Sequence, residues 1–232
     1  MNVVITGASQ GIGAAIARVF SQVSGAQITL VARNATKLNA VAAACREAGA
    51  KALAAPCDVT DEAAVAEMAA RVLDWGGAPD VLVNNAGAFT PGAIAETEAE
   101  TFRWQVEVNL TSAFLVTKAF LPAMTERESG HLFFMGSVAS IRAYAGGAAY
   151  CAAKHGLLGL ARVVREETKD AGLRVTTLLP GATLTPSWEG VDLPEARFMP
   201  AEDIAQTVLD TYRLSDRTVI EELLIRPQLG DI

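Results

Sequence analysis

The sequence contains few of the residues on which metal and disulfide chemistry depend. Only three cysteines and two histidines occur among its 232 residues. Cys45, Cys57 and Cys151 lie far apart and form no C-x-x-C pair. His131 and His155 both lack a carboxylate or cysteine partner at metal-ligand spacing. We therefore expect buried thiols, no disulfide framework, no metal site and no catalytic histidine.

Long apolar runs and excess positive charge are also missing. No apolar run approaches the ~20 residues that cross a bilayer, and the first expected strand begins at Asn2, which leaves no length for a signal peptide. Acidic residues outnumber basic ones by 26 to 19, for a formal net charge of -7. Nucleic acids and anionic membranes attract basic surfaces. We expect a cytoplasmic protein with neither of these partners.

Nothing in the composition divides the chain. It has no Pro/Gly/Ser-rich linker, charge block or internal repeat, so we expect a single domain over residues 1–232. Apolar runs that predict strands cover residues 3–6, 28–32, 51–57, 81–84, 131–136, 174–179 and 219–225. Amphipathic stretches that predict helices cover residues 14–20, 35–48, 61–75, 101–124, 148–171 and 201–212. This alternation indicates an α/β fold, a doubly wound parallel sheet of seven strands with helices on both faces.

The first strand leads directly into a glycine-rich turn, Gly7-Ala-Ser-Gln-Gly11-Ile-Gly13, and then into a helical pattern. Gly7 permits a tight turn, Gly11 lets the backbone approach a pyrophosphate, and Gly13 allows close packing of the helix on the strand. The free N–H groups of that helix then face an anion. An ordinary strand-to-helix turn also uses such glycines, but the position at the start of the chain favours the dinucleotide site of a Rossmann fold.

Tyr150 and Lys154 are separated by one helical turn. A helix stacks residues at this spacing on a single face, which brings an ammonium next to a phenol. A phenol loses its proton near pH ~10, and a nearby positive charge favours the phenolate. The pair is therefore a candidate for acid–base chemistry, although a tyrosine and a lysine also share helices by chance.

Three further motifs accompany this pair. Asn84-Asn85-Ala86-Gly87 follows the apolar run 81–83, Ser137 lies thirteen residues before Tyr150, and Pro180-Gly181 follows the run 175–179. Together with Thr6-Gly-x-x-x-Gly-x-Gly13, Asn109 and Tyr150-x-x-x-Lys154, the set resembles the short-chain dehydrogenase/reductase family in order and spacing over nearly the whole chain. The resemblance implies an oxidoreductase that transfers a hydride between a nicotinamide and a small carbonyl or alcohol substrate.

The resemblance also implies catalytic roles. Ser137 would hydrogen-bond the substrate oxygen and Tyr150 would transfer the proton. Lys154 would lower the pKa of Tyr150 and hold the nicotinamide ribose, and Asn109 would support a water-linked proton relay to Lys154. Ser140 competes with Ser137 for the first role. We favour Ser137 because its distance from Tyr150 fits the family, and we expect Ser140 to shape the substrate wall.

The residues after the second strand favour NADP (NADPH) over NAD. Ala32 stands where an NAD enzyme of this type carries an acidic residue, and Arg33 offers a guanidinium for a 2'-phosphate, although it would also suit a solvated surface. Gln10 adds no charge to the glycine turn. Asp58 is expected to contact the adenine or to cap a turn. The cofactor contacts implied in all are Gly7, Ser9, Gln10, Gly11, Ile12, Gly13, Arg33, Asn34, Asp58, Val59, Asn85, Ala86, Gly87, Tyr150, Lys154, Pro180, Gly181, Thr183 and Thr185.

The apolar loop at residues 184–200 lies where the family places its substrate lid, and it indicates a substrate with a hydrophobic or planar part or else a subunit interface. The last third of the chain is also similar to bacterial sepiapterin-reductase-type members, which implies a pterin side-chain carbonyl as an alternative substrate, with Asp231 as a candidate contact. A non-catalytic NADP-binding protein is a further alternative. Relatives commonly assemble through the helices expected at 101–124 and 148–171, which implies a homodimer or homotetramer.

Overall fold

The computed structural model describes residues 1–232 and contains a seven-stranded sheet in the order β3-β2-β1-β4-β5-β6-β7. All six strand pairings are parallel. The strands are β1 Asn2–Thr6, β2 Gln27–Ala32, β3 Lys51–Pro56, β4 Val81–Asn84, β5 Gly130–Met135, β6 Leu173–Pro180 and β7 Glu222–Ile225. The chain builds outward from β1 to β3 and then returns to place β4 on the other side of β1. This reversal creates a switch point between β1 and β4, where folds of this type bind ligands.

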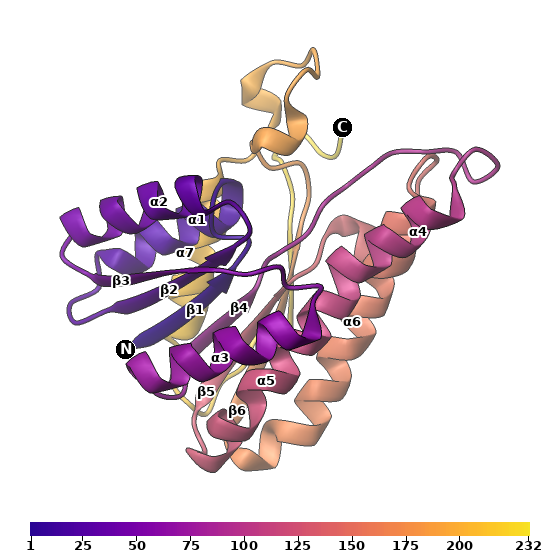
Figure 1. Ribbon diagram of the computed structural model, residues 1–232. Coiled ribbons are helices and arrows are strands. Elements are labelled where there is room, and N and C mark those ends of the chain that lie inside the picture. The colour runs from indigo at the N-terminus through magenta and orange to yellow at the C-terminus, as the bar shows by residue number, and fades with distance from the viewer.

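Helices cover both faces of the sheet, as Figure 1 shows. They are α1 Gly11–Ser21, α2 Ala35–Glu47, α3 Glu62–Gly76, α4 Ala99–Val106, α5 Ser112–Glu126, α6 Ala148–Thr168 and α7 Ala201–Tyr212. The helices α1, α2 and α7 pack on one face, and α3, α5 and α6 pack on the other. The predicted doubly wound α/β fold is confirmed. None of the helices combines the length and the apolar composition needed to cross a membrane.

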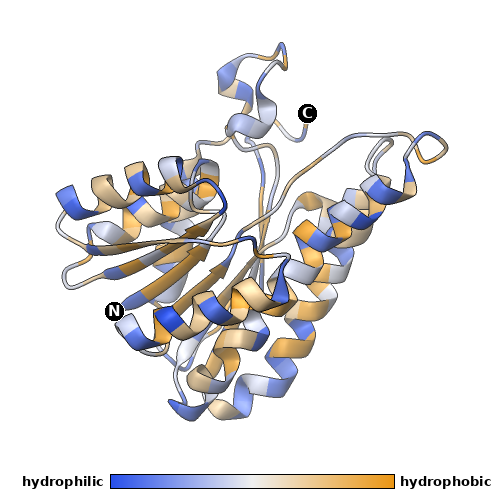
Figure 2. Ribbon diagram, viewed as in Figure 1, coloured by the Kyte–Doolittle hydropathy of each residue, from blue (hydrophilic) through white to orange (hydrophobic).

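The core consists of two apolar clusters separated by the sheet. In β1, Val3 and Ile5 belong to the cluster under α1 and α7, whereas Val4 belongs to the cluster under α5 and α6. All five residues of β1 are buried, because a strand covered on both faces has no polar side, and Figure 2 shows the same apolar character in the central strands. Each large buried side chain, such as Phe133, stabilises the fold by about 1.5–3 kcal/mol. This rigid sheet fixes the loops at its carboxyl edge.

Most predicted boundaries differ from the structure by one to three residues, and two elements show a physical reason. The last strand begins at Glu222, three residues later than expected, and before it the Ile220 carbonyl accepts from the Thr176 hydroxyl, a side-chain group. The helix expected at 101–124 extends from Ala99 to Glu126, and a π-helical segment, Glu107–Thr111, interrupts it. There the N–H of Ser112 donates to the Glu107 carbonyl, five residues back. Such insertions are frequent at functional sites.

Candidate active site

The sequence motifs gather at one edge of the sheet. The glycine turn follows β1, the 84–87 motif ends β4, Ser137 follows β5, and Pro180 ends β6. Because all of these strands are parallel, their carboxyl ends lie side by side. Segments separated by more than a hundred residues therefore form one site at the switch point.

Three positions of the glycine turn, 7, 11 and 13, have no room or no suitable backbone angle for a larger residue. Gly7 and Gly11 have φ angles of +64° and +55°, in the left-handed region. A Cβ atom on Gly7 would lie 2.8 Å from Asn85 Nδ2, and one on Gly13 would lie 2.5 Å from the Gly7 carbonyl oxygen. The roles predicted for Gly7 as a tight turn and for Gly13 in close packing agree with these contacts.

The amino end of α1 is suited to an anion. Its first turn contains no acidic side chain, and the Gln10 side chain does not cap the helix. Its first N–H groups and the positive end of the helix dipole therefore remain available to a pyrophosphate. A Cβ on Gly11 would meet the Thr185 side chain at 3.3 Å, so the start of the 184–200 loop lies over the same turn. This arrangement fits a dinucleotide.

The 84–87 motif connects β4 to the glycine turn. The backbone N–H groups of Asn85 and Ala86 both donate to the Thr6 hydroxyl at 3.0 Å, and Asn85 Nδ2 donates to the Thr6 carbonyl at 2.8 Å. Asn84 is buried and donates to the Thr117 hydroxyl at 2.9 Å. Asn85 therefore connects the end of β4 to the end of β1, and Asn84 connects β4 to α5.

Tyr150 and Lys154 stack on α6 as predicted. Lys154 Nζ lies 5.6 Å from the centre of the Tyr150 ring and donates to the Met135 carbonyl at 2.8 Å. The lysine side chain is almost fully buried. Its amine is therefore anchored to the end of β5, directly beside the tyrosine.

Asn109 lies within the π-helical segment and reaches the same point. Its side-chain amide accepts from the Ala88 N–H at 3.1 Å and donates to the Ala88 carbonyl at 2.8 Å. A Cβ on Gly87 would lie 2.8 Å from Asn109 Oδ1 and 3.5 Å from Lys154 Nζ. The structure thus brings Asn109 and Lys154 together around Gly87, where only a hydrogen fits.

Ser137 and Ser140 form a reciprocal pair, and this corrects the role we expected for Ser140. The Ser137 hydroxyl accepts from the Ala139 N–H at 3.1 Å, and the Ser140 hydroxyl accepts from the Ser137 N–H at 3.2 Å. Ser140 is fully buried, so it positions Ser137 and does not line a substrate wall. Sequence spacing alone does not reveal this inward orientation.

Replacement of Ser140 by Ala should loosen Ser137 without removing its hydroxyl. We expect kcat to fall by about threefold to tenfold with little change in KM for cofactor, because the lost hydrogen bond is worth about 1 kcal/mol. Ser140→Thr, which keeps the hydroxyl, should restore more activity than Ser140→Ala. Steady-state kinetics on the three proteins measure this, and equal kcat values for wild type and Ser140→Ala would contradict it.

Burial controls the protonation of Tyr150 and Lys154. Burial raises the pKa of Tyr150 to about 12, and the Ser137 hydroxyl acts against this rise through a hydrogen bond. Burial lowers the pKa of Lys154 to about 8. Desolvation of the phenol is the largest of the causes that act on the pKa of Tyr150. At neutral pH Tyr150 is protonated and has a proton to donate.

Charged and polar groups also gather beside the glycine turn. Arg33 Nη1 lies 4.0 Å from Asp58 Oδ2, and both side chains are largely exposed. Asp58 accepts from the Thr60 N–H and hydroxyl, which supports the capping alternative for this residue. Asn34 caps α2 by accepting from the Lys37 N–H at 2.9 Å.

Lys37 is a functional candidate that the sequence analysis missed. Its Nζ donates to Gln10 Oε1 at 2.8 Å, which places a cation against the glycine turn. The first turn of α2 contains no acidic side chain to neutralise it. The only available signal was its position one helical turn after Arg33, and this does not reveal the contact with Gln10, 27 residues earlier.

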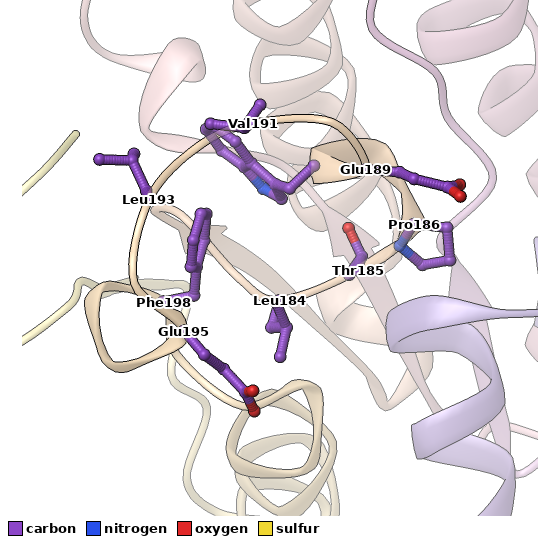
Figure 3. A pocket seen from close by; sticks show the side chains of 9 residues that line it. Leu184, Thr185, Pro186, Glu189, Val191, Leu193, Glu195 and Phe198 are labelled. Carbon is purple, nitrogen blue, oxygen red and sulfur yellow. The ribbon is translucent and has the colours of Figure 1, made fainter.

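The loop at residues 184–198 lines an open, mostly apolar hollow of about 340 Å³ (Figure 3). Its walls are Leu184, Thr185, Pro186, Trp188, Glu189, Val191, Leu193, Glu195 and Phe198. The rings of Trp188 and Phe198 meet edge to face at 5.1 Å. At its base the loop is closed by a hydrogen bond from the Leu184 N–H to the Met199 carbonyl.

Asp231 lies beside the end of β6, because a Cβ on Gly181 would lie 3.2 Å from Asp231 Oδ1. Arg226 binds both of its carboxylate oxygens, at 2.9 and 2.6 Å. Arg142 Nη1 lies 3.6 Å from Oδ2 of the same carboxylate. Asp231 is therefore close to the site but already paired.

This fold, with a glycine turn, an uncapped helix and an adjacent tyrosine–lysine pair, is that of a dinucleotide-dependent α/β enzyme. A family model for short chain dehydrogenases matches residues 1–195, and the chain belongs to this family of oxidoreductases.

Similar proteins span the whole chain. Sepiapterin reductase of Chlorobaculum tepidum is 36% identical over 98% of this chain and 96% of its own length. An alcohol dehydrogenase from Thermococcus sibiricus, solved with 5-hydroxy-NADP, is 30% identical with a TM-score of 0.93 over 100% of this chain and 98% of its own. A metagenomic short-chain oxidoreductase solved with NADP is 36% identical with a TM-score of 0.86, over 99% and 98%.

Proposed function

We propose that this protein is an NADP(H)-dependent reductase of small carbonyl compounds, with Tyr150 as the proton donor. The observation that carries this proposal is the convergence of Ser137, Tyr150 and Lys154 beside a glycine turn that fits a dinucleotide. The names of the similar oxidoreductases agree with it.

A bound nicotinamide would supply the hydride that converts the carbonyl to an alkoxide. The Ser137 hydroxyl would donate a hydrogen bond to the developing oxyanion, and Tyr150 would transfer its proton to it. The pKa of about 12 keeps Tyr150 protonated until that moment. Lys154 would contact the ribose and, through Asn109 and water, return a proton to the phenol. In the direction of alcohol oxidation the same groups act in reverse.

Three regions would hold the cofactor. The glycine turn and the start of α1 would bind the pyrophosphate, residues 85–87 and 180–185 would line the nicotinamide half, and Arg33 with Lys37 would bind a 2'-phosphate. Arg33 and Lys37 are exposed basic side chains, and the first turn of α2 contains no acidic side chain, although Asp58 lies 4.0 Å from Arg33. Both of the solved relatives described above contain an NADP form.

Oxidation of NADPH by a panel of aldehydes, ketones, diketones and pterins, with NADH in parallel, tests this function. We expect turnover with NADPH, and Arg33→Ala and Lys37→Ala should each raise KM for NADPH by about tenfold to a hundredfold, because a charge-assisted hydrogen bond contributes about 1.5–3 kcal/mol. KM for NADH should stay within about twofold. Lys51→Ala is the matched control, because Lys51 begins β3 and so lies at the edge of the sheet away from the site. It should leave KM for both cofactors unchanged.

Cofactor binding without turnover of any carbonyl would instead support a non-catalytic NADP-binding protein. A preference for NADH in the wild type, or an equal effect of Arg33→Ala on both cofactors, would contradict the proposed 2'-phosphate contacts.

A pterin side-chain carbonyl is the second candidate substrate. The similarity to a sepiapterin reductase and the position of Asp231 beside Gly181 favour it. A carboxylate suits the amino-pyrimidine edge of a pterin, but Arg226 would have to release Asp231 first. Preferential reduction of sepiapterin within the panel distinguishes this candidate.

Assembly as a homodimer or homotetramer stays a prediction. It is favoured by apolar side chains exposed on α4, α5 and α6, namely Phe102, Trp104, Phe114 and Val163. Sedimentation equilibrium measures the oligomeric state.

A further inference from the structure

Two aromatic side chains stand next to the catalytic tyrosine on separate loops. Phe89 follows β4, and its ring meets the Tyr150 ring edge to face at 5.1 Å with an interplanar angle of 67°. Tyr144 precedes α6, and its ring lies 6.3 Å from that of Phe89 at 68°. The three rings therefore form a continuous series that ends at the proton donor.

The backbone on both sides of Phe89 is held by buried amide side chains. Asn109 binds the N–H and carbonyl of Ala88 at 3.1 and 2.8 Å. Gln105 does the same for Thr90, at 3.2 and 3.0 Å. Asn109 and Gln105 are both 1% exposed. Two buried polar side chains thus fix the position of one aromatic residue.

Tyr144 is connected to the same loop. Gly92 and Gly147 form a parallel bridge, and the Gly92 N–H donates to the Gly146 carbonyl at 2.9 Å. The two aromatic residues are therefore carried by loops that are joined to each other. We call Phe89 and Tyr144 the aromatic wall.

The wall remains open despite this support. Phe89 is 42% exposed and Tyr144 is 44% exposed. Single exposed apolar side chains are common and need no explanation. Two adjacent exposed rings, fixed from behind and in contact with a proton donor, are the features of a ligand-binding surface.

We propose that the aromatic wall binds the flat face of a conjugated ring that carries the reacting carbonyl. The substrates are then aryl or heteroaryl aldehydes, ketones and diketones in preference to saturated analogues. This inference rests on the proposed function and names its substrate class.

Distance supports direct attachment of the ring to the carbonyl. The centres of Phe89 and Tyr150 are 5.1 Å apart, so a group packed on Phe89 lies about one ring width from the phenol. A carbonyl attached directly to such a group would lie beside the Tyr150 ring, whereas a carbonyl on a long side chain would not. Aromatic contacts of this kind contribute about 0.5–1.5 kcal/mol beyond area burial.

The test compares 1-phenyl-1,2-propanedione with 1-cyclohexyl-1,2-propanedione, which differ in ring planarity at similar size. In Phe89→Leu and in Tyr144→Leu, the ratio of kcat/KM for the phenyl over the cyclohexyl diketone should fall by about threefold to tenfold. The intrinsic reactivity difference between the two diketones is the same for every variant and cancels. Phe89→Tyr keeps the ring and should keep the ratio.

Phe114→Leu is the control, because Phe114 has a similar exposure on α5 and no contact with the wall. The ratio should not change in it. An unchanged ratio in both wall variants, or loss of the ratio in Phe89→Tyr, would overturn the inference, as would reduction of aliphatic carbonyls but of neither diketone. If only aliphatic carbonyls are reduced, the proposed function stands without the aromatic wall. If NADPH binds but no carbonyl is reduced, both the proposed function and the inference about the wall are wrong. If the leucine variants do not fold, Phe89→Met and Tyr144→Met, which also remove the ring, take their place in the same comparison.

Discussion

Replacement of Tyr150 by Phe should lower kcat by about 10²- to 10⁴-fold, the range that general acid–base catalysis contributes. The substitution removes one hydroxyl and keeps the ring, so the edge-to-face contact with Phe89 at 5.1 Å is retained. Lys154 remains anchored to the Met135 carbonyl. The loss should therefore appear in the chemical step.

Affinity for NADPH separates this loss from a binding defect. The proposed cofactor contacts come mainly from the glycine turn, Arg33 and Lys37, so we expect the dissociation constant for NADPH, measured by calorimetry, to change by less than about threefold. A large rise in that constant would mean that the hydroxyl supports the cofactor more than it supplies a proton.

Tyr212→Phe is the matched control for the same chemical change. Tyr212 lies on α7, where its ring packs 6.3 Å from that of Phe20 in the core cluster on the opposite face. Its kcat should equal that of the wild type. Retention of most activity in Tyr150→Phe would show that another group, such as Ser137 or a bound water, delivers the proton.

Local spacing explains why much of the site was predictable. A helix places residues four apart on one face, so Tyr150 and Lys154 had to be neighbours once α6 formed. Parallel strands place their carboxyl ends together, so the motifs after β1, β4, β5 and β6 had to meet. These relations follow from the periodicity of the elements.

Contacts between side chains of different segments were not predictable in this way. Lys37 reaches Gln10 from the next helix, and Gln105 reaches back to Thr90, and no local pattern encodes either contact. The inward orientation of Ser140 depends on the turn after β5. Burial, which controls the pKa of Tyr150, is a property of the assembled fold.

The π-helical segment illustrates the same limit in the fold itself. It adds one residue to the hydrogen-bonded turn around Asn109 while the helix continues on both sides. The apolar pattern of residues 101–124 therefore predicts a helix correctly but contains no clear mark of the insertion. The consequence is functional, because the segment directs Asn109 toward Ala88 and Gly87.

Replacement of Lys154 by Met should abolish most activity and remove one pH-dependent contribution to the stability. Lys154 is 3% exposed, and burial lowers its pKa to about 8. In the unfolded chain a lysine has a pKa of about 10.4. Below pH 8 the folded protein must hold a buried charge, whereas above pH 10.4 the side chain is neutral in both states.

The sign of the effect follows from these two values. A lysine with a depressed pKa in the folded state destabilises the fold by the largest amount below pH 8, and this penalty disappears as the pH rises to 10.4. A shift of this size corresponds to about 3 kcal/mol. Relative to Lys154→Met, the wild type should therefore gain about 2 kcal/mol of unfolding free energy between pH 7 and pH 10.

The absolute difference at pH 7 is smaller than this penalty. Methionine removes the buried charge but leaves the Met135 carbonyl without its donor, which costs about 1–3 kcal/mol. The change of the difference with pH is free of this offset, because the carbonyl does not titrate. Urea unfolding of both proteins at pH 7 and pH 10 measures it.

Lys51→Met provides the control, since Lys51 is exposed at the start of β3 and its replacement removes an amine without removing a buried charge. Its unfolding free energy should differ from that of the wild type by the same small amount at both pH values. If Lys154→Met also shows a constant difference, the amine is not desolvated as the structure indicates. If the difference changes with pH as expected while activity is lost, the buried amine destabilises the fold and is nevertheless needed for activity.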